Sequence, residues 1–325
     1  MLKTAYLLSA YTDPEHLGQL VRQLPPGADC YVHVDANVDI RPFRQATQGL
    51  DVRFMERRLH VGWGSFAQVE YQVGLLRTAL DTRTDYDFLF VLSAQDYPVW
   101  SGTRIERYLQ EHTGRNLIQA ICMDGQPPQT TRPYREYRLF SNLCLRPGSP
   151  ASKLRAATRR IGAHLLHKPL AFKADGRTFR LYKGSDYFAL NGETAAYVLD
   201  EWERCHELRR YFQTGFAPSE TFIHTLLFNS PLAGTCIQTA GTYRSLAALT
   251  PLTYIDYNPV IKVLTEADYD SIIASGKMFC RKVASGTSDR LVQMLDAHRQ
   301  KEATLWAVHA GGEPPAEEPD TLLQD

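Results

Sequence analysis

The sequence predicts an α/β protein with a central, mostly parallel β-sheet flanked by helices. Two observations carry this prediction. Short apolar runs alternate with stretches of helical periodicity through the first third of the chain, which is the pattern of βαβ units. The chain also has 325 residues, 44% of them hydrophobic, which is enough to bury a sizeable core as one large domain or two smaller ones.

The clearest elements lie in the first third of the chain. We expect strands at 4–10, 30–34, 52–55 and 88–92. Asp13 and Pro14 supply a helix N-cap and a proline at the first helical position, and apolar residues recur on one face until Pro25. Apolar spacing predicts two further helices, at about 66–80 and 103–111.

The second half continues the alternation. We expect a strand at 187–190 and helices at about 151–167, 191–209 and 219–228. Thr265 stands three residues before Asp268, as in a capping box, and predicts the start of another helix. The proline- and acid-rich end, 311–325, is expected to be a disordered tail.

Charge and hydropathy exclude several classes of protein. The 36 Lys and Arg residues balance 36 Asp and Glu, whereas nucleic-acid-binding domains carry a large cationic excess. No apolar run approaches the roughly 20 residues that cross a bilayer, and the N-terminus lacks the features of a secretory signal. We therefore expect no nucleic-acid partner, no transmembrane helix and a cytoplasmic location.

The cysteine pattern also argues against disulfides and zinc. The six cysteines are scattered and form no CxxC pair: Cys30, Cys122, Cys144, Cys205, Cys236 and Cys280. We expect free thiols in a reducing compartment, most of them acting as small apolar residues in or beside the core.

The segment 132–183 is rich in Lys and Arg and contains few acids, chiefly Glu136 and Asp175. Two interpretations are open. The cations belong to a solvated helix flanked by loops, or they form a surface that meets anionic lipid or a phosphate-bearing acceptor. In the second interpretation the protein contacts an anionic membrane peripherally.

Polar residues that follow strands are the first candidates for a site, because an open parallel sheet binds ligands at the carboxyl ends of its strands. Asp35, Asp96 and the pair Ser185-Asp186 fit this rule, although an Asp after a strand is more often a turn or helix cap. No GxGxxG or GxxxxGK[ST] sequence is present, which argues against a Rossmann dehydrogenase or a P-loop enzyme.

Asp-x-Asp, a pattern that holds a divalent metal in many sugar-nucleotide enzymes, occurs twice but is poorly placed. The pattern at 85–87 enters its strand at the wrong edge of the sheet, and the pattern at 268–270 lies in the first turn of a helix, where acids favour the helix dipole. Since hard cations need several converging oxygen ligands, the sequence predicts no metal site.

Two other features have both an ordinary and a chemical interpretation. Glu220 follows Ser219 in a predicted first helical turn, where the helix dipole alone explains a carboxylate; a catalytic base would also need such a fixed, ionised position. Arg281 and Lys282 are either solvated or positioned to neutralise a diphosphate leaving group.

Seven short sequence motifs occur one after another along about residues 4–284. Together they make the chain resemble the core-2/I-branching enzyme family. They are His33-Val34-Asp35, Val61-Gly62-Trp63-Gly64-Ser65, the run from Phe90 to Pro98, the run from Lys183 to Leu190, Pro218-Ser219-Glu220, Tyr254-Ile255-Asp256-Tyr257 and Phe279-Cys280-Arg281-Lys282-Val283. The family includes branching β-1,6-N-acetylglucosaminyltransferases and peptide O-xylosyltransferases. One such motif is weak evidence, but seven motifs in this order are specific for the family.

This resemblance implies a GT-A-like fold in a single large domain with a basic insertion. It divides the chain into a nucleotide-binding half at 1–115, a basic, partly helical insertion or acceptor-side segment at 116–183, and a catalytic half with closing helices at 184–310. It further implies an inverting glycosyltransferase that uses a UDP-sugar donor, needs no cofactor or divalent metal, and acts on a hydroxyl of a glycan, polysaccharide or peptide. N-acetylglucosamine and xylose are the sugars expected.

The resemblance also assigns roles to residues. Glu220 would be the base that deprotonates the acceptor hydroxyl, and Lys282 would hold the UDP phosphates, helped by Arg281. The expected donor-binding residues are Asp35, Trp63, Asp96, Ser185, Arg281 and Lys282. The expected acceptor-binding residues are Arg135, Tyr137, Asp186 and Tyr187.

The chain departs from the family pattern at three positions. Ser219 stands where Asp is common, and Tyr11 replaces a frequent histidine. Thr253 stands where many members have Arg, so that Arg281 or Arg244 would have to supply the second cation on the phosphates.

Two other functions remain open from the sequence. A metal-dependent hydrolase would use His33, Asp35, Asp96 and His224 as ligands, although no local ligand pair supports it and His224 is more consistent with a satisfied core residue. A non-catalytic carbohydrate-binding protein on the same fold would stack sugars on aromatic residues. Those aromatic residues are Trp63, Tyr97 and Tyr187.

Overall fold

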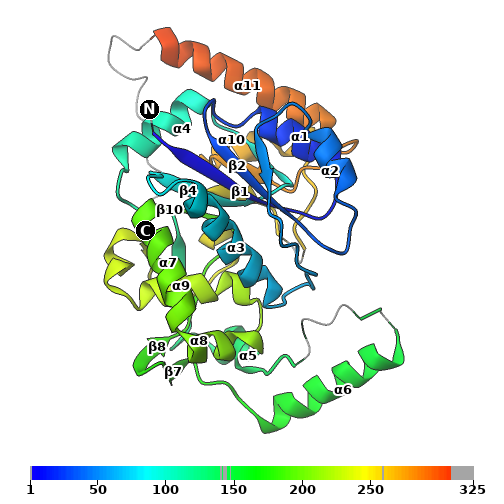
Figure 1. Cartoon of the computed structure of the whole chain (residues 1–325), viewed down its shortest axis with the longest axis vertical. Helices are drawn as coiled ribbons and strands as arrows, with labels where there is room; N and C mark the ends of the chain where they lie inside the picture. Colours follow the sequence, from blue (N-terminus) through cyan, green and yellow to red (C-terminus); the bar gives the residue numbers. More distant parts are fainter. Residues whose placement is uncertain (1, 140, 142–144, 147, 258–259, 309–325) are drawn as a thin grey trace.

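A five-stranded sheet lies at the centre of the molecule. The computed structural model describes residues 2–139, 141, 145–146, 148–257 and 260–308. The strand order is β10-β4-β1-β2-β3, with every neighbouring pair parallel except β10 and β4 (Figure 1). The strands are β1 (Thr4–Ala10), β2 (Asp29–Val34), β3 (Val52–Phe54), β4 (Phe88–Ser93) and β10 (Phe188–Leu190). The predicted α/β fold with a mostly parallel sheet is thus confirmed, and it is consistent with a GT-A-like fold.

Both faces of this sheet are buried along its central strands, which explains why β1 and β4 are nearly continuous apolar runs. Ala5 and Leu7 of β1 pack into one core, while Tyr6 and Leu8 point to the opposite face and pack into a second one. The first core is covered by α3 (Ala67–Thr82), α7 (Gly192–Arg204), α8 (His206–Gln213) and α9 (Phe222–Phe228). The second is covered by α1 (Pro14–Arg22), α2 (Arg41–Ala46), α4 (Gly102–Glu111), α10 (Tyr269–Ala274) and α11 (Asp289–Val308).

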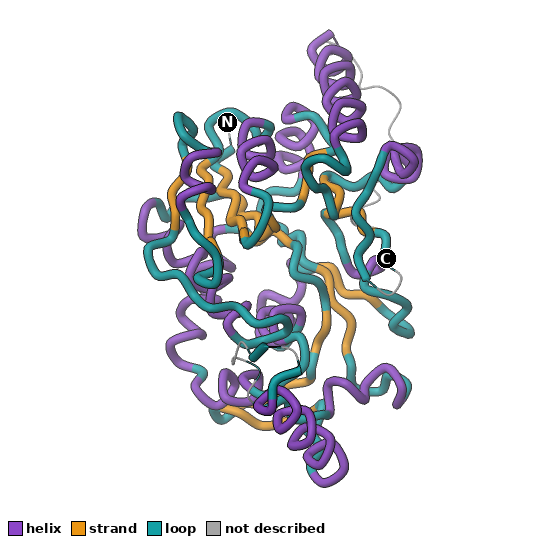
Figure 2. The backbone as a smooth tube through the Cα atoms, turned by 90° about the vertical axis from the view of Figure 1, so that its right-hand side faces the viewer, coloured by secondary structure: helices purple, strands orange, loops and turns teal. Residues whose placement is uncertain are grey.

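Smaller sheets extend the molecule away from the central one. One has the order β12-β13-β5 and another β11-β6-β9, and β7 and β8 form a hairpin. These strands are β5 (Asp96–Pro98), β6 (Gln119–Cys122), β7 (Ala171–Ala174), β8 (Arg177–Arg180), β9 (Tyr182–Lys183), β11 (Ile237–Thr239), β12 (Thr253–Ile255) and β13 (Phe279–Arg281). Figures 1 and 2 place α11 at one end of the molecule and the β7–β8 hairpin at the other.

The remaining elements are short helices and one longer helix. They are α5 (Pro128–Arg135), α6 (Pro150–Leu165) and four 3-10 helices: η1 (Pro218–Glu220), η2 (Pro231–Thr235), η3 (Ala247–Leu249) and η4 (Glu266–Asp268). The predicted capping box is confirmed, with Thr265 and Asp268 bonded reciprocally at the start of η4. Helix α6, within the basic segment, stands away from the body of the protein (Figure 1).

Two predicted helices were wrong in detail. The helix expected at 191–209 is two helices, because Cys205 leaves the helical conformation between α7 and α8. The helix expected at 219–228 is the 3-10 turn η1 followed by α9, since Thr221 interrupts it. Ser219 therefore lies inside η1 and caps no helix, and Glu220 is the last residue of that turn.

The basic segment is less uniformly exposed than its composition indicates. Lys168 and Lys183 are almost fully buried, at 2% and 3% exposure, so they contribute nothing to a cationic surface. Across the described ranges, no helix is both long and apolar enough to span a membrane. The described cysteines are free thiols, four buried and Cys122 partly so. Cys144 and the acidic tail at 311–325 lie outside the described residues.

Candidate active site

Lys282 lies where β1 and β4 end. Its Nζ donates to Tyr11 Oη at 3.3 Å, and Tyr11 Oη donates to Gln95 Oε1 at 2.9 Å. A backbone hydrogen bond also holds the Lys282 segment against the end of β4, because Val283 N donates to Gln95 O at 2.9 Å. Tyr11 follows the last residue of β1 and Gln95 lies two residues beyond β4. The predicted phosphate-binding lysine is thus at the carboxyl edge of the parallel sheet, where such folds bind ligands.

Arg281 is held in the interior by Asp96. The two residues face each other across the β13–β5 pair, and Arg281 Nη1 donates to Asp96 Oδ1 at 3.1 Å. Asp96 is fully buried, and this burial raises its pKa although Arg281 opposes the change. The Arg281 guanidinium also lies 4.8 Å from the centre of the Tyr187 ring. Asp96 thus contacts Arg281, and the pair fixes the backbone that carries Lys282.

Asp35 directly follows β2 and organises the loop beside it. Its Oδ1 accepts from Asn37 N at 2.8 Å, from Asn37 Nδ2 at 2.9 Å and from Val61 N at 3.3 Å. This last bond connects Asp35 to the loop that carries Trp63. The Trp63 side chain is 83% exposed, and its ring centre lies 6.2 Å from that of Phe216. Of the aromatics considered for sugar stacking, Trp63 is exposed, whereas Tyr97 and Tyr187 are buried.

Glu220 forms an ion pair with a buried lysine. Lys183 Nζ donates to Glu220 Oε2 at 2.5 Å, with only 4% of the lysine side chain and 18% of the glutamate side chain exposed. Burial lowers the pKa of Lys183, but Glu220, Tyr134 and Tyr243 together outweigh it and the pKa is raised. The backbone reinforces the pair, because Gly184 N donates to Glu220 O at 2.8 Å. Tyr134 and Tyr243 surround the ammonium, with the Tyr243 ring centre 5.6 Å from Nζ.

Asp186 lies beside this pair. Burial together with the charge of Glu220 raises its pKa to about 6. Asp186 Oδ1 is buried and has no hydrogen-bond partner among the described residues. Because β10 runs antiparallel to β4, with Phe188 opposite Val91, Asp186 comes just before β10 at the same sheet edge. Ser185, 1% exposed, turns its hydroxyl to Tyr187 O at 3.2 Å.

Gly184 is required by the close packing beneath the ion pair. A Cβ at this position would lie 2.3 Å from Gln119 O and from the His224 ring. His224 is fully buried, and burial lowers its pKa to about 3. Both of its ring nitrogens lack hydrogen-bond partners within the described part of the chain. The expectation of a satisfied core histidine was therefore right about burial and wrong about hydrogen bonding.

The four residues of the hydrolase alternative do not converge. No group of three or more His, Cys, Asp or Glu side chains suitable for a metal ion occurs in the described ranges. His33 accepts from Leu59 N at 3.0 Å and stacks on Tyr71, and burial lowers its pKa to about 4. His33 is thus integrated into the packing between β2 and α3.

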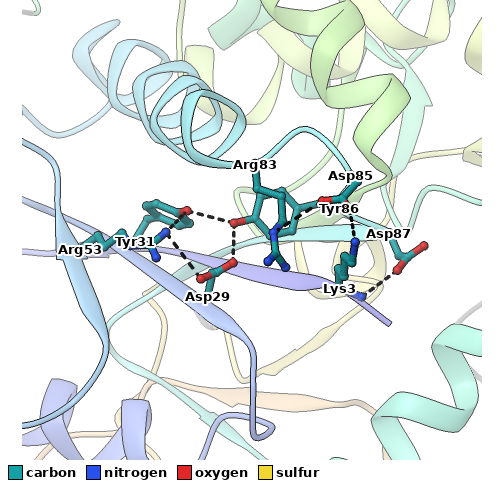
Figure 3. A network of polar contacts seen from close by, with 8 residues as sticks. All are labelled: Lys3, Asp29, Tyr31, Arg53, Arg83, Asp85, Tyr86 and Asp87. Carbon is teal, nitrogen blue, oxygen red and sulfur yellow. Dashed lines mark hydrogen bonds and ion pairs between the residues drawn. The ribbon is translucent and has the colours of Figure 1, made fainter. Parts of the chain in front are cut away.

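The Asp-x-Asp pattern at 85–87 lies at the opposite edge of the sheet, as predicted. Lys3 N donates to Asp87 Oδ2 at 2.7 Å, and the Lys3 ammonium pairs with Asp85. Figure 3 shows both acids beside the start of β1, next to the hydrogen-bonded group of Tyr86, Asp29 and Tyr31. Asp85 and Asp87 thus bind Lys3, the residue just before β1, and stabilise this edge of the sheet.

Two predicted acceptor residues, Arg135 and Tyr137, both contact Lys168. Arg135 ends α5 and is exposed, and the Tyr137 ring centre lies 5.0 Å from Lys168 Nζ. The structure instead brings Tyr134, Tyr243 and Lys183 to Glu220. None of these three was among the expected site residues, although Lys183 stands in the same sequence motif as Ser185 and Asp186. That adjacency is the signal that could have identified it.

The fold, together with Lys282 and the Lys183–Glu220 pair, defines an α/β protein whose candidate site lies at the carboxyl edge of a mostly parallel sheet. The model of the Core-2/I-Branching enzyme family matches residues 4–258, which is most of the chain, and the protein belongs to this family. The resemblance to this family that the seven sequence motifs indicated is thereby confirmed.

Several curated proteins are similar to this chain. Xylosyltransferase 1 of Homo sapiens is 27% identical over 212 residues, covering 64% of this chain and 20% of that protein. Xylosyltransferase 2 of Homo sapiens is 26% identical over 286 residues, covering 82% and 30%. Xylosyltransferase oxt of Drosophila pseudoobscura pseudoobscura is 25% identical over 232 residues, covering 69% and 22%. The chain spans less than a third of the length of these relatives.

Proposed function

We propose that this protein is an inverting glycosyltransferase that moves a sugar from a UDP-sugar to a hydroxyl group of a glycan, polysaccharide or peptide. Its family and its xylosyltransferase relatives support glycosyl transfer. The observation that carries the residue assignment is the partly exposed Glu220, held in place by Lys183. Xylose and N-acetylglucosamine are the two donor sugars that we would test first.

The reaction is a single displacement. Glu220 takes the proton of the acceptor hydroxyl while that oxygen forms a bond to the anomeric carbon of the donor sugar. The bond from the anomeric carbon to the phosphate oxygen breaks, and UDP leaves with the electron pair. Lys282 stabilises the negative charge that develops on the diphosphate. Attack opposite the leaving group inverts the configuration at the anomeric carbon.

The donor site would extend along the sheet edge from Asp35 to Lys282. Asp35 would meet the uracil end, with Trp63 and Ser185 contributing to the donor side. Arg281, fixed by Asp96, adds positive charge behind Lys282. Arg244 is exposed beside Tyr243, which places it on the loop next to the Lys183–Glu220 pair and makes it a candidate for the second phosphate cation.

The test is UDP release from UDP-xylose and UDP-N-acetylglucosamine, with and without EDTA, by the full chain and by Glu220→Gln. We expect release with at least one donor, unchanged by EDTA, and a loss of about 10²- to 10⁴-fold in the variant. Near-normal turnover in Glu220→Gln would show that another group is the base. Activity that disappears on chelation would favour a metal-dependent reaction, and sugar binding without UDP release would favour the carbohydrate-binding alternative.

Peripheral membrane contact through residues 132–183 is a separate part of the proposal. Helix α6 and its preceding turn carry Lys153, Arg155, Arg159 and Arg160 and contain no acid between 148 and 165, and anionic lipid attracts such a segment. Cosedimentation with phosphatidylserine vesicles, compared with phosphatidylcholine vesicles, tests it. Equal binding to both would eliminate the charge-based contact.

A further inference from the structure

Lys168 buries its ammonium group at the C-terminal end of α8. The residue is only 2% exposed. Its Nζ donates to Tyr211 O and, at 2.9 Å, to Thr214 Oγ1. It also lies 4.3 Å from the centre of the Tyr211 ring and 5.0 Å from that of Tyr137. All of these partners are uncharged, and burial lowers the pKa of Lys168 to about 8. A buried charge is costly unless its surroundings compensate for it.

The end of α8 supplies this compensation. The last carbonyls of a helix lack intrahelical partners and carry partial negative charge. The Tyr211 carbonyl is one of them, because Gly215 N, its partner in a longer helix, donates to Phe212 O at 2.9 Å instead. Thr214 is the C-cap residue of α8. The Lys168 ammonium therefore caps this helix and fixes the position of its last turn.

The same helix end is bonded to both ends of the excursion that carries α6. The chain leaves α5 at Arg135 and returns to the body of the protein at Lys168, whose N–H donates to Arg135 O at 2.8 Å. Arg138 N donates to Thr214 O, also at 2.8 Å. Helix α6 lies between these points and stands away from the body (Figure 1). The base of the excursion is thus closed against the end of α8.

The chain that follows this helix end leads directly to Glu220. The Arg138 guanidinium lies 4.3 Å from the centre of the Phe216 ring. Ala217 then has a left-handed conformation, with a φ of 41°, which is unfavourable for a residue other than glycine and persists only where the surrounding structure holds it. Glu220 N donates to Ala217 O at 3.1 Å. Glu220 is therefore presented by a strained turn whose preceding helix is capped by Lys168.

We propose that Lys168 is a positioning residue for Glu220, because it caps α8 inside the protein and so fixes the turn that presents the carboxylate. This inference rests on the proposed role of Glu220 as the base. Lys183 bonds to the carboxylate itself, whereas Lys168 holds the backbone that leads to it. The basic segment thereby takes part in the reaction through a buried lysine, independently of any contact with a membrane.

The experiment compares the full chain with Lys168→Met, which keeps the unbranched apolar stem and removes the ammonium. The kcat and donor KM of UDP release are measured with UDP-xylose or UDP-N-acetylglucosamine, whichever supports turnover. UDP affinity is measured by calorimetry, and thermal unfolding gives the folded fraction to which kcat is referred. We expect kcat to fall about 10- to 100-fold, the loss that a misplacement of about 1 Å causes. Donor KM and UDP affinity should change less than about twofold.

Further variants separate positioning from a general structural role. Thr214→Val removes the hydroxyl to which Nζ donates and should lower kcat, whereas Thr214→Ser keeps this hydroxyl and should recover most of the rate. Lys301→Met, which replaces an exposed lysine of α11, should behave as the parent. In the double variant Glu220→Gln/Lys168→Met, kcat should lie within about twofold of that of Glu220→Gln, because effects that act through one group do not add.

Three results would overturn the inference. A parent-like kcat in folded Lys168→Met would show that the cap does not position the base. A parallel loss of UDP affinity would indicate a general structural defect, and a large additional loss in the double variant would show that Lys168 acts elsewhere. If Lys168→Met does not fold, equal rates in Thr214→Val and Thr214→Ser overturn it.

The outcome is separable from that of the proposed function, because Glu220→Gln tests the base directly. If Glu220→Gln is inactive while Lys168→Met and Thr214→Val are normal, only this inference fails. If Glu220→Gln is active, the base assignment fails first.

Discussion

Replacing Asp186 with Asn should stabilise the protein at neutral pH, independently of any effect on activity. One oxygen of this partly buried carboxyl is enclosed. Its pKa is raised from 3.8 to about 6, so the folded protein resists its ionisation. A group whose folded pKa is raised in this way destabilises the fold as the pH rises from the unfolded value to the folded one, and the full cost is present above about pH 6.

The size of this effect follows from the shift. A shift of about two units corresponds to roughly 3 kcal/mol at 1.36 kcal/mol per unit. Since Asn has nearly the same shape as Asp and carries no charge, most of this cost should be recovered in the variant. For a chain of this length we expect a gain of about 3 °C in melting temperature at pH 7.5, using roughly 2 cal/mol/K of unfolding entropy per residue.

The assay is thermal unfolding of both proteins at pH 7.5 and at pH 4. The difference should disappear at pH 4, where Asp186 is mostly neutral in the folded protein and the two side chains carry nearly the same charge. Asp200→Asn serves as the control because that side chain is exposed. A variant that is less stable than the parent at pH 7.5, or a gain that persists unchanged at pH 4, would refute the argument from burial.

Three other substitutions test separate parts of the site. Lys282→Ala should weaken UDP binding about 10- to 100-fold, the loss expected for one charge-assisted hydrogen bond; unchanged affinity in calorimetry would remove its proposed role. Asp96→Ala should cost about 3–5 kcal/mol of unfolding free energy in denaturant titration, because it leaves the buried Arg281 without its carboxylate. A loss below 1 kcal/mol would mean that Arg281 reaches another partner. Gly184→Ala should cost about 3 kcal/mol or more, since its Cβ would meet the Gln119 carbonyl at 2.3 Å; a neutral effect on melting temperature would contradict the close packing.

The central sheet could be predicted from the sequence because its signals are local. The apolar runs of β1, β2 and β4 are buried on both faces, so each reads as a continuous run. Asp13 and the Thr265–Asp268 capping box mark helix starts within a few residues. The same local reasoning failed at Glu220, because the sequence around Ser219 is also compatible with the short 3-10 turn that the structure contains.

The charge pairs of the site could not be predicted, because they join residues that are far apart in the chain. Lys183 and Glu220 are separated by 37 positions, and Arg281 and Asp96 by 185. Both pairs depend on strand pairings in the smaller sheets, where the strands have only two or three residues and give little sequence signal. Arg281 therefore looked like a free phosphate-binding cation in the sequence, whereas the structure shows it bonded to Asp96.

The two pairs differ in what they can contribute to a reaction. Asp96 is fully buried and Arg281 nearly so, which suits a fixed support that keeps Lys282 at the sheet edge. Glu220 keeps 18% of its side chain exposed beside a lysine that has 4%, so only the acid of this pair is available to an acceptor. Asp186 feels the charge of Glu220, which together with burial raises its pKa, so a carboxyl in this part of the site comes at a cost in stability. Thermal unfolding of Asp186→Asn at pH 7.5 and pH 4 therefore measures this cost separately from any transfer reaction.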